Sequence, residues 1–147
     1  MSSGPVRGGS PREADLNVDQ RVEYWDSLAE YDLVTAETML AGGRLLYVGF
    51  MCHQTVEKAL KALHWFVSGA EPERIHSLTR LARSTGIAGE LSEGHRDLLD
   101  VLDPLNLEAR YPTDKERILA SLTKERCENI LDETRRLFAW LRRKYGR

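Results

Sequence analysis

The chain has 147 residues, a length typical of one domain, and 41% of them are hydrophobic. Its formal net charge of −2 argues against a protein whose whole surface attracts nucleic acid. A membrane-spanning helix needs about 20 consecutive apolar residues, and the chain has no such run. Residues 1–19 also lack the apolar stretch of a secretory signal, so we expect a cytoplasmic protein without membrane contact.

The residue types that carry metal or cofactor chemistry are sparse. The two cysteines, Cys52 and Cys127, lie far apart in sequence, and no Cys or His residues have the spacing of metal ligands. The chain also lacks the glycine-rich phosphate loop, the dinucleotide-binding fingerprint, the zinc-protease motif and the serine-hydrolase motif. We therefore expect reduced, buried cysteines, no metal site and no bound cofactor.

The first predicted elements are a tail and a long helix. Residues 1–19 are rich in Gly, Ser, Pro and charge, which predicts a flexible tail before a helical domain of residues 20–147. The helix begins after Asn17 or Asp19, either of which could be its N-cap, and ends at the glycine pair 42–43. Its apolar face contains one acidic residue, Asp32, which must be paired, hydrogen-bonded or placed at the rim of a cavity.

The next predicted elements are a second long helix and a short one. Helical periodicity runs from about residue 44 to residue 67 and ends at Ser68 and Gly69. After a turn at residues 71–73, a short helix begins near His76 and ends at Gly86.

Two further helices are predicted in the last third of the chain. One fits residues 92–107, where Pro104 should kink or shorten it. Residues 109–116 predict a break, because Pro112 disfavours a helical conformation at the residue before it. The last helix begins with Thr123 as its cap. No stretch alternates as a strand does, so the fold class is all-α: an up-and-down four-helix bundle with an additional short helix.

A polar stripe crosses the middle of the second helix. Gln54, Glu57, Lys58 and Lys61 fall at offsets 0, 3, 4 and 7, which places them along one face. Such a stripe can be a solvated surface, a dimer interface with apolar neighbours, or a binding site.

Two other positions are candidates for binding. His76 follows a turn and opens a helix, where backbone N–H groups are unpaired, so it can serve a cap or a site. Arg110 and Tyr111 join a helix end to a turn; a guanidinium suits phosphate or carboxylate, and a tyrosine can stack on a base. Arg110 could equally pair with Glu57 or Asp32 and close one end of the bundle.

The C-terminal helix has six basic residues and no acidic residue after Thr134. Cations at a helix C-terminus are favoured by the helix dipole, which explains part of this bias without a partner. Contact with nucleic acid at this end is the alternative.

Four blocks of the sequence come in an order that resembles the HEPN domain, the higher eukaryote and prokaryote nucleotide-binding fold. They are residues 25–36 of the first helix, residues 50–62 of the second, His76-Ser77-Leu78, and Ala109-Arg110-Tyr111-Pro112. The resemblance implies a four- to five-helix up-and-down bundle that usually forms a homodimer. Many such proteins are encoded with a small nucleotidyltransferase and act as the toxin of a toxin–antitoxin pair. Others are inferred to bind nucleotides, and a large branch are metal-independent ribonucleases.

The ribonuclease branch depends on an Arg followed, after four to six residues, by a His. From Arg110 these positions hold Lys115, Glu116 and Arg117, and no arginine of the chain has a His at this spacing. Cleavage at a ribose 2′-OH needs a general acid or base with a pKa near neutrality. The chain therefore looks like the branch with the R-Y-P form of the motif.

The resemblance implies a HEPN-domain protein that binds a nucleotide or another small phosphate compound, a nucleotidyltransferase-type protein partner, or both, and that acts as the toxin-like member of a toxin–antitoxin pair. The expected binding residues are Gln54, Lys58, Lys61, His76, Arg110 and Tyr111, with Asp32 and Glu57 as structural polar partners. Two alternatives remain open: a ribonuclease toxin that acts on RNA with an atypical site of His76 and Arg110, and a purely structural dimeric module.

Overall fold

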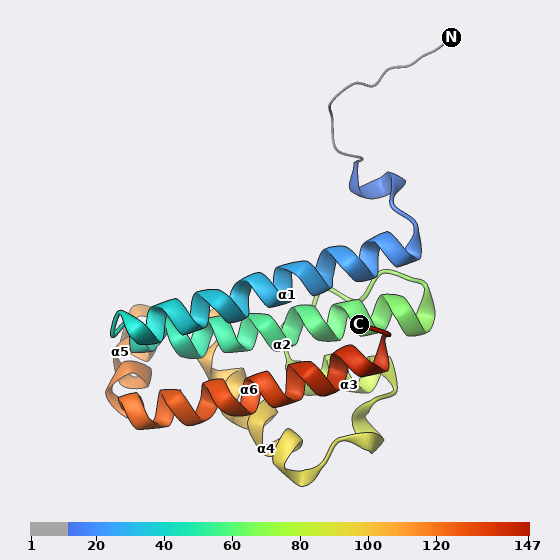
Figure 1. The fold of residues 1–147 in the computed structure, drawn as a ribbon. Coiled ribbons are helices and arrows are strands. Elements are labelled where there is room, and N and C mark those ends of the chain that lie inside the picture. The colour runs from blue at the N-terminus through green and yellow to red at the C-terminus, as the bar shows by residue number, and fades with distance from the viewer. Residues whose placement is uncertain (1–11) are drawn as a thin grey trace.

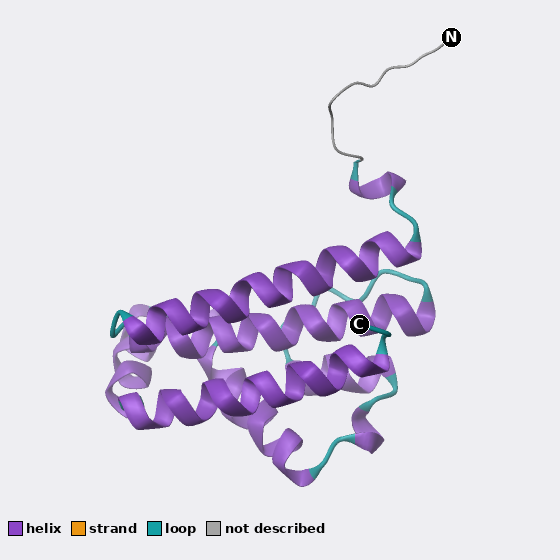
Figure 2. Cartoon of the chain, in the orientation of Figure 1, coloured by secondary structure: helices purple, strands orange, loops and turns teal. Residues whose placement is uncertain are grey.

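The fold is a bundle of helices, and the computed structural model describes residues 12–147. In chain order the elements are η1 (Glu13–Asp15), α1 (Val18–Ala41), α2 (Leu45–Ser68), α3 (Leu78–Thr85), η2 (Ala88–Glu90), α4 (Glu93–Leu102), η3 (Asp103–Leu105), η4 (Leu107–Ala109), α5 (Pro112–Ser121) and α6 (Lys124–Lys144). The described residues contain helices and loops but no strand (Figure 2). The all-α prediction is confirmed.

Three long helices run side by side: α1, α2 and α6 (Figure 1). The middle of α2 is buried almost all round, because α1 and α6 pack along it and α3 crosses it. Leu60 and Leu63 of α2 belong to the same core cluster as Leu131 and Leu141 of α6, and each is at most 2% exposed. Burial of a leucine side chain contributes about 1.5–3 kcal/mol, so this seam carries much of the stability of the fold.

The N-terminus of α1 is fixed by a capping box. The Asn17 side chain accepts a hydrogen bond from the Gln20 backbone N–H at 2.8 Å, and the Gln20 side chain accepts one from the Asn17 N–H at 2.9 Å. Asn17 is therefore the cap, and α1 begins at Val18. The predicted tail of residues 1–19 lies for the most part outside the described residues.

Helix α5 corrects the prediction of a break at residues 109–116. The break is found only up to Tyr111, whose backbone is extended, and α5 then begins at Pro112 itself. Proline is well tolerated at the first helical position, because the N–H that it lacks would have no partner there. Asp114 supports the start of the helix by accepting a hydrogen bond from the Tyr111 N–H at 3.3 Å.

The region around Pro104 also differs in length from the prediction. Helix α4 ends at Leu102 rather than near Leu107, and Pro104 lies in the following 3₁₀ turn, so the expected shortening at this proline is confirmed. This turn lies very close to α2: a Cβ atom added at Gly49 would be 2.8 Å from Leu105 Cδ1. The small residue allows η3 to pack against the helix.

Ion pairs link α6 to the rest of the bundle. Arg135 pairs with Glu37, Arg142 with Asp26, Lys144 with Glu90, and Arg147 with Asp19. Four of the six basic residues near the C-terminus thus have acidic partners within the chain. This pairing leaves little of the positive charge that contact with nucleic acid would need. None of the described helices is long and apolar enough to cross a lipid bilayer.

Candidate functional site

The polar stripe of α2 is organised around one buried carboxylate, that of Glu57. The residue is 3% exposed. Its Oε2 accepts a hydrogen bond from Lys61 Nζ at 3.1 Å, and its Oε1 lies 3.1 Å from His76 Nδ1. Lys61 is one turn away on the same helix, whereas His76 comes from the loop before α3. Glu57 therefore holds a lysine and a histidine in place at the edge of the bundle.

His53 lies one turn before Glu57 and is completely buried. Its Nδ1 lies 3.3 Å from Gln54 Oε1 and 3.9 Å from Glu57 Oε1. Its Nε2 lies 3.7 Å from Asp103 Oδ1, beyond hydrogen-bond distance. The same Asp103 oxygen accepts the first backbone N–H of α3, that of Leu78, at 2.9 Å. The histidine thus lies between two carboxylates that fix the loop and the start of α3.

Lys58 belongs to a different contact, although it is next to Glu57 in sequence. Its ammonium group donates to the Asp32 carboxylate on α1. The side chains of Lys58 and Asp32 are 20% and 11% exposed. The acidic residue on the apolar face of α1 is therefore paired, and it joins α1 to α2.

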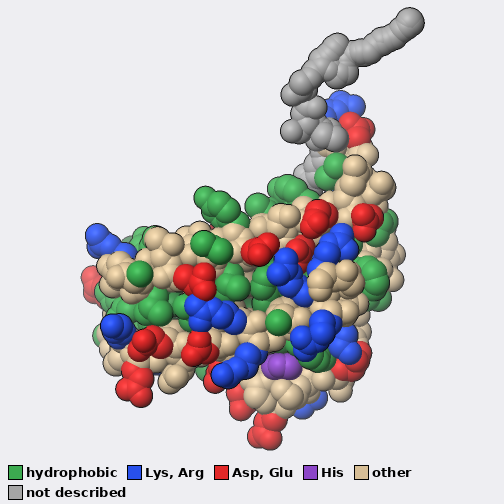
Figure 3. Space-filling view, viewed as in Figure 1, with side chains coloured by type: hydrophobic (Ala, Val, Ile, Leu, Met, Phe, Trp, Pro, Cys, Tyr) green, Lys and Arg blue, Asp and Glu red, His purple; other side chains and the backbone are tan. Residues whose placement is uncertain are grey.

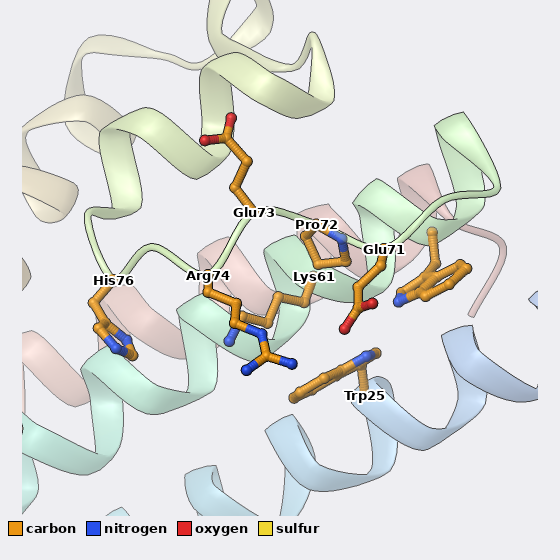
Figure 4. A pocket seen from close by; sticks show the side chains of 8 residues that line it. Trp25, Lys61, Glu71, Pro72, Glu73, Arg74 and His76 are labelled. Carbon is orange, nitrogen blue, oxygen red and sulfur yellow. The ribbon is translucent and has the colours of Figure 1, made fainter. Parts of the chain in front are cut away.

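A hollow of about 340 Å³ opens where α1, α2 and the loop of residues 69–77 meet (Figure 4). Its lining consists of two indoles, three basic side chains, two glutamates and a proline: Trp25, Trp65, Lys61, Arg74, His76, Glu71, Glu73 and Pro72. Lys61 Nζ lies 5.0 Å from the centroid of the Trp25 ring, a distance typical of a cation–π contact. Lys61 and His76 are the expected binding residues that the fold brings together here.

The loop that covers the hollow is held at both ends. Gly69 ends α2 with a φ of 66°, a conformation that favours glycine, and the His64 ring lies 3.0 Å from the Ala70 carbonyl oxygen. At the other end, His76 contacts Glu57, and Ser77 caps α3 by accepting the Arg80 N–H at 3.3 Å. His76 therefore precedes the helix cap and faces the site.

Arg110 and Tyr111 lie apart from this hollow. Arg110 donates to the backbone carbonyls of Pro104 and Asp103 at 3.1 and 3.4 Å, rather than to Glu57 or Asp32. It lines a second hollow of about 130 Å³ together with residues of α5. Tyr111 is 77% exposed. The expected binding residues thus do not form one site: Lys61 and His76 line the first hollow, Arg110 and Tyr111 lie elsewhere, and Lys58 and Gln54 contact Asp32 and His53.

Trp25, Trp65, Glu71 and Arg74 are lining residues that the sequence did not single out as binding residues. Both tryptophans sit in helical patterns, where an aromatic side chain ordinarily indicates core packing. Trp65 follows Lys61 by one helical turn, and Arg74 lies two residues before His76, so proximity to these two residues is the signal that could have found them. Among the described residues, no group of three His, Cys, Asp or Glu side chains is placed to hold a metal ion.

Comparisons with known proteins identify one family by sequence and similar folds among solved structures. Residues 22–144 match the family model of the HEPN domain. The crystal structure of TT1696 from Thermus thermophilus is similar, with a TM-score of 0.70 and 24% identity over 84% of this chain and 98% of that one. So is that of ST0689, an archaeal HEPN homologue, with a TM-score of 0.59 and 25% identity over 86% of this chain and 98% of that one. No curated protein matches the chain.

Proposed function

Because this chain belongs to the HEPN domain family, we propose that the hollow between α1, α2 and the loop of residues 69–77 binds a nucleotide. The observation that supports this proposal is the lining itself: two indoles and three basic side chains surround one cavity of about 340 Å³. Small-molecule sites occupy about 300–1,000 Å³ and combine apolar walls with a few placed polar groups. A nucleotide needs the same combination, an aromatic surface for the base and cations for the phosphate.

Arg74 and Lys61 would bind the phosphate. In the part of the chain that the structure describes, Arg74 makes no ion pair, and its guanidinium is directed toward Lys61 and Trp25 (Figure 4). Lys61 uses one of its three N–H donors on Glu57, so two donors remain for a ligand. Glu57 orients the ammonium group and reduces the side-chain entropy that binding would otherwise cost.

The indole of Trp25 would stack on the base. Its ring is partly exposed and forms one wall of the hollow. Stacking of a base on an aromatic side chain contributes about 1–3 kcal/mol. Trp65 also lines the hollow but is only 8% exposed, and the Arg21 guanidinium lies 4.5 Å from the centroid of its ring.

Calorimetric titration with nucleoside monophosphates and with inorganic phosphate tests the proposal. We expect Lys61→Ala and Arg74→Ala to weaken nucleotide binding by roughly tenfold or more, the value of one lost charge-assisted hydrogen bond. Lys144→Ala is a matched control, because Lys144 also lies 5.0 Å from a tryptophan ring, that of Trp140, and also pairs with a glutamate, Glu90, and none of these residues lines the hollow.

Removal of Lys61 also leaves Glu57 with fewer partners, so thermal unfolding of each variant must be measured alongside. Arg74→Ala makes the test independent of this effect, since it breaks no ion pair in the described chain. Equal affinities of wild type, Lys61→Ala, Arg74→Ala and Lys144→Ala, or no binding by any of them, would contradict the proposal.

The proposed biological role is that of a toxin-like member of a toxin–antitoxin pair, with a nucleotidyltransferase-type protein as partner. We assign this partner to the surface of Arg110, Tyr111 and α5. Tyr111 is 77% exposed, α5 buries none of its residues, and Leu119 of α5 is 47% exposed. An exposed apolar surface of this kind is typical of a protein interface.

A homodimer is the second proposed assembly, and we assign it to the outer face of α1. Tyr24, Tyr31 and Val34 are spaced by seven and three residues, and they are 46%, 72% and 54% exposed. Figure 3 shows apolar side chains along this edge of the molecule. A row of this kind on one helix can meet its copy across a two-fold axis.

A further inference from the structure

One carboxylate without a partner among the described residues faces the aromatic wall of the hollow. It belongs to Glu71, which lies on the loop two residues after Gly69 and directs its side chain toward the Trp25 indole (Figure 4). Within residues 12–147, Glu71 forms no hydrogen bond or ion pair. Glu73, the next acidic residue, points away from Lys61 and Trp25 in the same view. A hollow suited to an anionic ligand thus carries one acceptor beside its aromatic wall.

The lining is divided along the length of the hollow. Trp25 and Glu71 lie toward one end, and His76 lies at the other, with Arg74 and Lys61 between them (Figure 4). This order matches the order of groups in a nucleotide, in which the base and the phosphate are separated by the sugar. A base that stacks on Trp25 would have its edge at Glu71, and the phosphate would extend toward the basic side chains.

The chemistry of a carboxylate selects among the bases. An ionised carboxylate is a pure acceptor with two oxygens side by side. The Watson–Crick edge of guanine presents two adjacent donors, N1–H and the N2 amino group, which match these two oxygens. Adenine and cytosine present an amino group beside a ring-nitrogen lone pair, which would face the second oxygen without a proton between them. A site built to accept two donors therefore rejects a base that offers one.

We infer that the hollow is selective for guanine nucleotides and that Glu71 is its specificity-determining residue. Glu71 accepts guanine N1–H and N2–H while Trp25 stacks on the ring. This inference rests on the proposed function and specifies its ligand class.

Titration with guanosine, inosine and adenosine monophosphates tests the inference, because the three share sugar and phosphate. We expect affinity to fall in that order, since inosine keeps N1–H but lacks the N2 amino group. The guanosine compound should bind about tenfold more tightly than the adenosine compound, the discrimination expected of one bidentate pair.

Glu71→Gln gives the sharpest variant. A carboxamide offers one acceptor and one donor, the complement of adenine N6–H and N1, so the preference for guanosine monophosphate should disappear or reverse. Glu128→Gln is the matched control, because it makes the same chemical change on an exposed glutamate of α6 that does not line the hollow, and it should keep the wild-type preference. Glu71 is exposed and unpaired in the described chain, so its substitution should leave the fold intact.

The outcomes separate the two proposals. Equal binding of guanosine and adenosine monophosphates by the wild type would overturn guanine selectivity. A guanine preference that is unchanged in Glu71→Gln would overturn the role of Glu71. In both cases nucleotide binding would stand. Failure of all three compounds to bind would overturn the proposed function and, with it, this inference.

Discussion

Asp26 is the buried acid that joins α1 to α6. It is 2% exposed, and its two oxygens accept hydrogen bonds from Arg142 at 2.9 and 2.8 Å and from the Tyr145 hydroxyl at 2.6 Å. Burial, followed by this hydrogen bond, raises the pKa of Tyr145 well above its usual range, so the phenol stays a donor. All the groups that meet at Asp26 are therefore satisfied.

Asp26→Ala should lower the free energy of unfolding by roughly 2–4 kcal/mol, because it leaves a buried hydroxyl and a partly buried guanidinium without their acceptor. Urea denaturation measures the loss. Asp132→Ala is the control: it removes an acid that also pairs with an arginine, Arg135, but is 56% exposed, so the loss should be below about 1 kcal/mol. Similar losses in the two variants would contradict a structural role for the buried pair.

The sequence predicted part of the site around Glu57. Glu57 and Lys61 are four residues apart on a helix, a spacing that predicts a side-chain pair. The contact of Glu57 with His76, 19 residues later, depends on the path of the loop, and helical periodicity carries no information about that path. For the same reason the sequence placed Gln54, Lys58, Arg110 and Lys61 in one groove, while their contacts in the structure lie in different places.

At the scale of elements, the long helices could be predicted and α5 could not. The patterns of α1, α2 and α6 repeat over at least 21 residues each, and each helix ends at a recognisable cap or turn. Helix α5 has ten residues, none of them buried, so it lacks the apolar periodicity that identifies a helix. A proline at its first position looked like a break, although the same proline favours a helix start.

Helix α1 also carries a testable interface in its outer row. We expect sedimentation velocity to show a dimer for the wild type and a monomer for Tyr31→Glu, because a charge in the row would have to be buried against a copy of itself. Tyr111→Glu is the control, since Tyr111 is equally exposed, at 77% against 72%, but lies outside the row. A monomeric wild type, or a Tyr31→Glu variant that stays dimeric, would refute this interface.

In the whole molecule, the site forms only when several segments of the chain come together on folding. The bundle itself follows from helical periodicity, and the resemblance to the HEPN domain on four sequence blocks is confirmed by the family match over residues 22–144. The hollow forms only when α1 contributes Trp25, α2 contributes Lys61 and Trp65, and the following loop closes over them. The ligand would therefore contact segments that are far apart in the sequence, and its binding should stabilise the folded bundle.

If a nucleotide occupies this hollow, its binding should shift the indole N–H signals of the tryptophans that line it, which a heteronuclear NMR titration can follow. The chain has three tryptophans. Trp25 and Trp65 line the hollow, whereas Trp140 belongs to α6 and contacts His95 and Lys144. On titration with guanosine monophosphate we expect two of the three indole signals to shift together, with the Trp140 signal unchanged. Three unchanged signals, or a shift confined to Trp140, would show that the nucleotide does not bind in this hollow.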